Sequence, residues 1–167
     1  MTAGLRIEKL RRDHNVDGFE SGRAELDRFL IRYAFHAQQS GASLTYVALV
    51  ETTVIAYYTL VFGDVAHADA PERLTKGLAR YPVPLMVLAR LAVHRGWQGR
   101  GLGAGLLRDA MERTLRAAEI AGLRALAVHA KDQAAASFYS HFGFIASPTD
   151  PLHMFMLLKD VRRMLGA

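Results

Sequence analysis

The sequence predicts an α/β fold in which a mixed central sheet is flanked by helices. Two strand-turn-helix segments carry this prediction. An apolar stretch over 85–93 leads through several glycines into an amphipathic helix, and a second strand over 123–130 leads into a shorter helix. Two stretches rich in β-branched and aromatic residues, over 45–50 and 54–61, add an antiparallel hairpin.

The N-terminal part predicts a short strand and then one amphipathic helix. Apolar residues alternate over 5–10, and the polar stretch over 17–22 reads as a turn, with Ser21 available as the helix N-cap. From there, apolar residues recur at steps of three and four, which places them on one helix face: Leu26, Phe29, Leu30, Tyr33, Ala34 and Ala37. Arg28 and Arg32 fall on the opposite face.

The central part predicts a buried strand after an irregular segment. Over 63–84 the pattern is interrupted by proline and glycine, which indicates a loop with one short helix. The interrupting residues are Pro71, Gly77, Pro82 and Pro84. The stretch over 85–93 is apolar on both alternating faces except at Arg90, as in a central strand covered on both sides. The helix that follows begins near Leu102 and can end at Gly122.

The C-terminal part predicts a second strand-helix unit and a hairpin. Asp132 can cap a helix that ends at Gly143. The stretches 144–145 and 152–157 then pair around a turn over 148–151, and 159–164 forms a terminal helical turn.

Length and composition are those of one ordinary globular domain over residues 1–167. Apolar residues make up 51% of the chain and charged residues 22%. Charges interrupt the apolar residues of the N-terminus, and no window resembles a membrane span, so we expect a cytoplasmic protein. The absence of cysteine excludes disulfides, thiolate nucleophiles and sulfur-ligated zinc sites.

The charge balance favours a partner that carries phosphates. The formal net charge is +5 and the sequence pI is about 9.8. A positive potential of this kind attracts nucleic acids, although coenzyme A, which itself carries several phosphates, satisfies the same charge.

The glycine-rich stretch 98–103, Gln-Gly-Arg-Gly-Leu-Gly, predicts an anion site. It joins a buried strand to a helix, where converging backbone amides and the helix dipole bind a phosphate. A P-loop is excluded, because no Lys-Ser or Lys-Thr follows the second glycine. A dinucleotide fold expects an acidic residue at the end of the next strand, where this chain has His129-Ala130. A glycine turn that only permits tight packing stays an alternative.

The same stretch resembles the Q/R-x-x-G-x-G/A motif of the GCN5-related N-acetyltransferases, and 136–144 is similar to that family's A-x-x-F-Y-x-x-x-G-F segment. The resemblance implies the GNAT fold and acetyl-coenzyme A as co-substrate. It also implies that the pyrophosphate meets the amides of 98–103 and that the pantetheine arm pairs with the backbone of Leu91 and Val93. The cofactor-binding residues that it implies are Leu91, Ala92, Val93, Gln98, Gly99, Arg100, Gly101, Leu102, Gly103 and Phe138.

A finer resemblance extends to the toxin branch of this family, which acetylates the amino acid on charged tRNA and is paired with a ribbon-helix-helix antitoxin. The matching stretches are 19–22, 26–27, 41–47, 81–84 and 88–93. This chain departs from that branch at Glu20-Ser21 and at His94. The resemblance implies aminoacyl-tRNA and an antitoxin as partners, and a homodimer stays open.

Tyr139 is the candidate general acid, because the family resemblance places its hydroxyl beside the sulfur of coenzyme A. A core aromatic residue is the alternative. The sequence shows no pair that would serve as a general base. An α-amine, with a pKa near 7.7–8.0, needs less help than a lysine amine near 10.4, which favours an aminoacyl-tRNA or a protein N-terminus as acceptor.

Four arginines are candidate RNA contacts: Arg28, Arg32, Arg80 and Arg90. Solvated helix faces and an ordinary salt bridge at Arg90 are the alternatives. No metal-ligand spacing joins His94, His129 and His153, so we expect no metal site. Acetylation of a protein N-terminus or small amine, and a non-catalytic binding module, stay open beside the tRNA-acetylating toxin.

Overall fold

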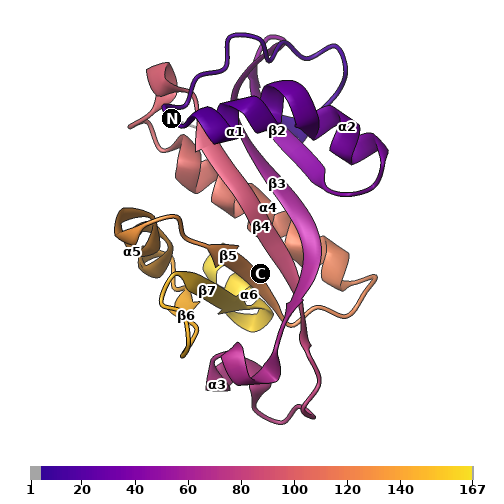
Figure 1. Ribbon diagram of the computed structural model, residues 1–167, viewed down its shortest axis with the longest axis vertical. Helices are drawn as coiled ribbons and strands as arrows, with labels where there is room; N and C mark the ends of the chain where they lie inside the picture. The colour runs from indigo at the N-terminus through magenta and orange to yellow at the C-terminus, as the bar shows by residue number, and fades with distance from the viewer. Residues whose placement is uncertain (1–4, 167) are drawn as a thin grey trace. The chain divides into compact units, whose positions relative to one another are not determined.

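The computed structural model describes residues 5–166. Met1–Gly4, the start of the N-terminal stretch whose charges argue against a secretion signal, and Ala167 lie outside the described residues. Within the described residues, seven strands form one sheet in the order β1-β2-β3-β4-β5-β7-β6 (Figure 1). β4 and β5 are parallel, whereas the β1-β2, β2-β3, β5-β7 and β6-β7 pairs are antiparallel. The predicted mixed sheet with flanking helices is confirmed.

The elements follow the predicted order closely. In chain order they are β1 (Arg6–Lys9), α1 (Ala24–Arg28), a π-helical turn (Phe29–Tyr33), α2 (Ala34–Gln39), β2 (Leu44–Val50), β3 (Thr53–Val65), a 3₁₀ turn (His67–Asp69), α3 (Glu72–Thr75), β4 (Val83–Val93), a second 3₁₀ turn (Arg95–Trp97), α4 (Leu102–Ala118), β5 (Ala125–His129), α5 (Gln133–His141), β6 (Ile145–Ala146), β7 (His153–Leu157) and α6 (Leu158–Leu165).

The chain divides into two compact units, each of which is described by itself. The first unit comprises residues 1–61 and 89–110, and the second comprises residues 62–88 and 111–167. The prediction of one domain over residues 1–167 stays a prediction. No helix in the described part of the chain is both long enough and apolar enough to cross a membrane.

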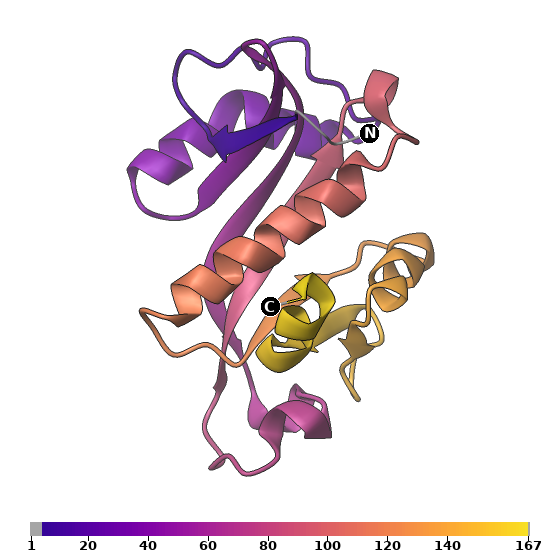
Figure 2. The same ribbon diagram turned by 180° about the vertical axis from the view of Figure 1, so that it is seen from behind.

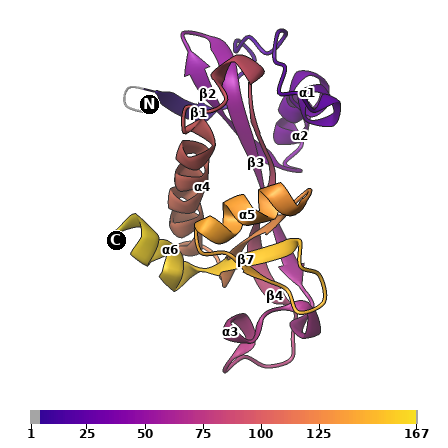
Figure 3. The ribbon, with the colours of Figure 1, turned by 90° about the vertical axis from the view of Figure 1, so that its left-hand side faces the viewer.

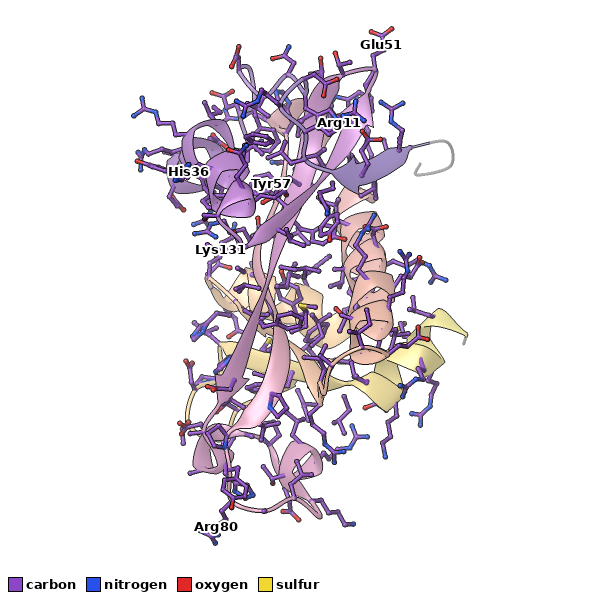
Figure 4. All side chains as sticks on the ribbon, turned by 90° about the vertical axis from the view of Figure 1, so that its right-hand side faces the viewer. Arg11, His36, Glu51, Tyr57, Arg80 and Lys131 are labelled. Carbon is purple, nitrogen blue, oxygen red and sulfur yellow. The ribbon has the colours of Figure 1, made fainter. Side chains whose placement is uncertain are left out.

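In the first unit, the N-terminal helical segment packs on one face of the sheet (Figure 1). Leu30, Ala34, Val47 and Tyr57 are all buried in this core. The Tyr57 hydroxyl donates a 2.6 Å hydrogen bond to the carbonyl of Leu26, which ties β3 to α1 (Figure 4). Burying these apolar groups offsets the conformational entropy that the segment loses on folding.

The prediction of one regular helix from Leu26 is wrong, because a π-helical turn separates α1 from α2. A π turn holds more residues than an α turn, so the steps of three and four no longer mark one face. Tyr33, expected to be buried, is 54% exposed. Gln38 faces inward instead, and its side chain bonds to the carbonyl of Leu10 and the amide of Thr45.

The expected N-cap at Ser21 is also wrong. Arg23 occupies the N-cap position of α1 and gives no side-chain cap. The Ser21 hydroxyl lies 2.6 Å from the Asp27 carboxylate, to which it donates, and it also accepts from the amide of Arg23. Ser21 therefore closes a local turn before the helix rather than capping it.

In the second unit, the strand layer consists of β5, β6, β7 and the parts of β3 and β4 that fall in this unit, and α5 precedes β6. The predicted cap is confirmed, because Asp132 accepts a 2.9 Å hydrogen bond from the amide of Ala135 at the start of α5. Phe155 on β7 is fully buried. The final helix, α6, follows β7 without a loop and is longer than the expected turn (Figure 3). α4 is one continuous helix that contributes residues to both units (Figure 2).

Candidate functional site

The first part of the candidate site is the turn that joins β4 to α4 in the first unit. His94 precedes a 3₁₀ turn over Arg95–Trp97, and its Nδ1 accepts a 3.0 Å hydrogen bond from the amide of Gly96. The His94 ring also meets the Phe19 ring edge to face, at 6.0 Å between centroids. His94 therefore helps to hold the conformation of this turn.

Gln98 holds the turn in place, a role that the sequence did not reveal. Its Nε2 donates to the carbonyl of Val93 at 2.9 Å and to the carbonyl of Ser21 at 2.8 Å. The amide of Arg95 donates to the carbonyl of Glu20 at 2.7 Å. The segment Glu20-Ser21, where the chain departs from the toxin branch, thus supports the glycine turn through its main chain.

Two glycines give the turn its conformation. Gly99 has a φ of 79° and Gly101 a φ of 83°, in the left-handed region that other residues rarely adopt. The turn leads directly into α4, whose first amides have no partner within the helix. Alternating backbone handedness at a helix N-terminus is the arrangement that binds an anion with main-chain N–H groups.

Side chains around the turn add two exposed cations, Arg95 and Arg100. The Arg100 guanidinium lies over the Trp97 ring at 4.6 Å from its centroid. Leu102 is buried, which anchors the start of α4 in the core. Gly103 is half-buried in the first turn of the helix.

The predicted contacts of the pantetheine arm lie at the end of β4. Ala92 is buried in the core of the first unit, whereas Leu91 and Val93, its neighbours on the opposite face, are half-buried. The parallel ladder between β4 and β5 pairs Leu85–Leu88 with Ala125–Val128. Residues 89–93 extend β4 beyond this ladder.

The candidate acid, Tyr139, lies on α5 in the second unit. Its side chain is 7% exposed and packs edge to face against the rings of Phe138 and Phe144. Burial raises the pKa of the Tyr139 hydroxyl to about 12, so the phenol keeps its proton at neutral pH. A protonated phenol is the form that a general acid requires, while the ring contacts equally suit a core aromatic residue.

The structure brings three of the four candidate RNA-binding arginines into the first unit. Arg28 and Arg32 are exposed on α1 and the π turn. Arg90 stacks on the ring of Phe29, with its guanidinium carbon 3.6 Å from the ring centroid. Arg90 therefore makes a cation–π contact, whereas the alternative to an RNA contact had been a salt bridge. Arg80 belongs to the second unit and extends outward from the loop between α3 and β4 (Figure 4).

A histidine-aspartate pair in the second unit was missed by the sequence analysis. His129 Nε2 lies 3.0 Å from the Asp150 carboxylate, and the His129 and His153 rings stack at 4.6 Å. Burial, together with the nearby His129, lowers the pKa of His153. These side chains come from β5, β7 and the turn before β7, so only strand pairing could have revealed them. Among residues 5–166, no cluster of three metal-ligating side chains is found.

Comparison with known proteins gives a family and close relatives. Residues 7–144 match the model of the acetyltransferase (GNAT) family. The tRNA-acetylating toxin of Mycobacterium tuberculosis (strain ATCC 25618 / H37Rv) is 47% identical over 152 residues, which cover 91% of this chain and 91% of that protein.

Solved structures of similar proteins agree with the fold. AtaT complexed with acetyl-methionyl-tRNAfMet superposes with a TM-score of 0.89 at 27% identity, over 96% of this chain and 99% of that one. A tyrosine-to-phenylalanine mutant of the AtaT toxin, bound to the C-terminus of the antitoxin AtaR and to acetyl-CoA, gives a TM-score of 0.82 at 26% identity, over 98% and 99% of the two chains.

Proposed function

This chain belongs to the acetyltransferase (GNAT) family, and we propose that it transfers the acetyl group of acetyl-coenzyme A to the α-amino group of an aminoacyl-tRNA. One observation carries the choice of acceptor: the 47% identity with a tRNA-acetylating toxin extends over 91% of both proteins. Blocking the amino group of a charged tRNA stops peptide-bond formation. The chain thereby acts as the toxin of a toxin-antitoxin pair.

The glycine turn over 98–103 binds the pyrophosphate of the cofactor in this proposal. Its support is the left-handed Gly99 and Gly101, the N-terminus of α4, and the two hydrogen bonds by which Gln98 fixes the turn. Main-chain groups of Leu91 and Val93 pair with the pantetheine arm, Ala92 holds this end of β4 in the core, and Phe138 contributes an apolar contact.

The chemical step is attack of the neutral amine on the thioester carbon. A C–N bond forms, the C–S bond breaks, and the leaving thiolate takes the proton of Tyr139. The amine loses one proton, which returns to the phenolate or passes to water. Because an α-amine with a pKa near 7.7–8.0 is substantially neutral at physiological pH, the acceptor attacks without a strong base.

The basic charge of the chain supports an RNA acceptor over a small amine. Arg28, Arg32 and Arg90 share the first unit and Arg80 adds an exposed cation in the second, so phosphates have several contacts available. The partner that silences the toxin is an antitoxin of the ribbon-helix-helix type. Both act in the cytoplasm, where charged tRNA is used.

The proposal is tested by incubating the purified protein with radiolabelled acetyl-coenzyme A and a set of tRNAs. Label should enter charged tRNA and not the same tRNA after its amino acid is removed, and translation in a cell-free system should stop. If label enters a protein N-terminus or small amine while every charged tRNA stays unlabelled, the tRNA proposal fails and the alternative acceptor replaces it.

A further inference from the structure

A pocket of about 320 Å³ in the second unit is lined mainly by cationic side chains. Its lining residues are Arg73, Lys76, Leu123, Arg124, Leu157, Leu158, Lys159 and Arg162. Three leucines and five cations therefore share one small cavity. Sequence patterns do not reveal this site, because its members come from α3 and the residue after it, from the residues before β5, from the end of β7 and from α6.

Two of the arginines are held in position by bonds within the unit. Arg73 Nη1 donates to the Asp160 carboxylate at 2.7 Å, which links α3 to α6. Arg124 Nε donates to the carbonyl of Leu74 at 2.9 Å. A guanidinium has five N–H donors, and each of these bonds uses one. A cation held in this way loses less side-chain entropy when it binds a ligand.

The character of the lining favours a phosphate backbone over a small organic ligand. Small-molecule pockets are mostly apolar with a few polar groups, whereas here cations form the majority. Lys76, Lys159 and Arg162 are exposed, so their charge reaches a ligand that approaches from outside. Planar guanidinium groups suit the paired oxygens of a phosphate.

We propose that this pocket binds backbone phosphates of the tRNA, as an RNA contact additional to Arg28, Arg32, Arg80 and Arg90. The inference rests on the proposed function, because it supposes that tRNA is the acceptor. Phosphates bound here add affinity that depends on salt and not on base sequence. The contact therefore serves tRNA in general rather than the choice of one amino acid.

The test replaces two exposed cations of α6 that take no part in the Arg73–Asp160 pair. For Lys159→Glu/Arg162→Glu, the Kd for uncharged tRNA should rise at least ten-fold at low salt. The slope of log Kd against log salt should fall by roughly one to two, at about 0.7–0.9 per lost phosphate contact. The milder Lys159→Gln/Arg162→Gln should shift both quantities in the same direction, with thermal melting to confirm folding.

The matched control is Lys9→Glu/Arg116→Glu, which changes the net charge equally through one exposed lysine and one exposed arginine outside the pocket. Its Kd for tRNA should stay within about two-fold of the wild type. An equal loss in the control would show that only overall charge matters and would overturn the pocket. Unchanged tRNA affinity in the α6 variants, or a loss confined to antitoxin binding, would overturn it as well.

A second readout separates this inference from the proposed function. The α6 variant should lose at least ten-fold more kcat/KM on aminoacyl-tRNA than on an aminoacyl-adenosine, which lacks the phosphate backbone. If the wild-type protein acetylates no charged tRNA, the proposed function fails. If it does acetylate charged tRNA and the two losses are equal, only the pocket fails.

Discussion

The two units carry their candidate functional groups in different ways. Beside its candidate RNA-binding arginines, the first unit has a candidate anion site of main-chain amides, set by Gly99, Gly101 and the start of α4. In the second unit, the candidate groups are side chains: the Tyr139 hydroxyl, the cationic pocket and the His129–Asp150 pair. A main-chain site is sensitive to backbone conformation and tolerant of side-chain exchange, and a side-chain site shows the reverse.

The largest effect, a loss of turnover, is expected from removing the hydroxyl oxygen of Tyr139 in the second unit. Tyr139→Phe should lower kcat by roughly 10²–10⁴-fold, the usual loss for a general acid, because the thiolate then leaves unprotonated. The Kd for acetyl-coenzyme A, measured by calorimetry, should hardly change. Tyr81→Phe removes the same atom from a tyrosine that is 75% exposed and should leave kcat unaltered. A Tyr139→Phe protein with full turnover would make this residue a core aromatic only.

A smaller effect is expected from a backbone change in the first unit. A β-branched residue at Gly101, with its φ of 83°, costs about 1–2 kcal/mol in the left-handed conformation. Gly101→Val should therefore weaken acetyl-coenzyme A binding by roughly ten-fold, although a Cβ there would meet no atom within 4 Å.

The control for that variant is Gly18→Val, at a glycine that is also uncrowded but lies outside the left-handed region. Its Kd for the cofactor should match the wild type. Equal affinity in both variants would mean that the conformation of the turn does not determine cofactor binding. The main-chain character of this site would then be wrong.

Charge reversal in the first unit should affect RNA and spare the cofactor. Arg28→Glu/Arg32→Glu is expected to raise the Kd for tRNA several-fold and to flatten its salt dependence, because two phosphate contacts are lost. Acetyl-coenzyme A binding should stay as in the wild type. Filter binding over a salt series measures the Kd for tRNA and its salt dependence. Unaltered tRNA affinity would place the RNA surface elsewhere.

The smallest effect is expected from His153. Its pKa is lowered in the folded protein by burial and by His129, whereas Asp150 and Asp69 act in the opposite direction. Between this lowered pKa and the ordinary 6.5, the unfolded chain binds more protons, so stability is lost as the pH falls through 6.5. The fall in Tm between pH 7.5 and 5.5 should be smaller for His153→Asn. An identical fall in Tm in the wild type and the variant would contradict a contribution of His153 to the pH dependence of stability.

Local chemistry explains which sequence predictions the structure confirms. Asp132 caps α5 because a short carboxylate next to a helix start finds a free amide three residues on. The prediction of one regular helix around Phe29 was wrong because a π turn is less favourable than an α turn on its own. Here the Phe29 ring stabilises it by packing on Tyr57 and Arg90. The three- and four-residue spacing of apolar residues does not reveal such tertiary contacts.

By itself, the sequence determined the order of strands and helices and the glycine turn. Its motifs at 98–103 and 136–144 pointed to the acetyltransferase family. These follow from the conformational freedom of glycine, helix capping and hydrophobic periodicity, which act over a few neighbouring residues. Only the tertiary structure decided the Gln98 hydrogen bonds to Ser21 and Val93, the pairing of His129 with Asp150, and the cationic pocket joined by Arg73 and Asp160. Most of these contacts join residues far apart in the chain, which strand pairing and helix packing alone bring within bonding distance.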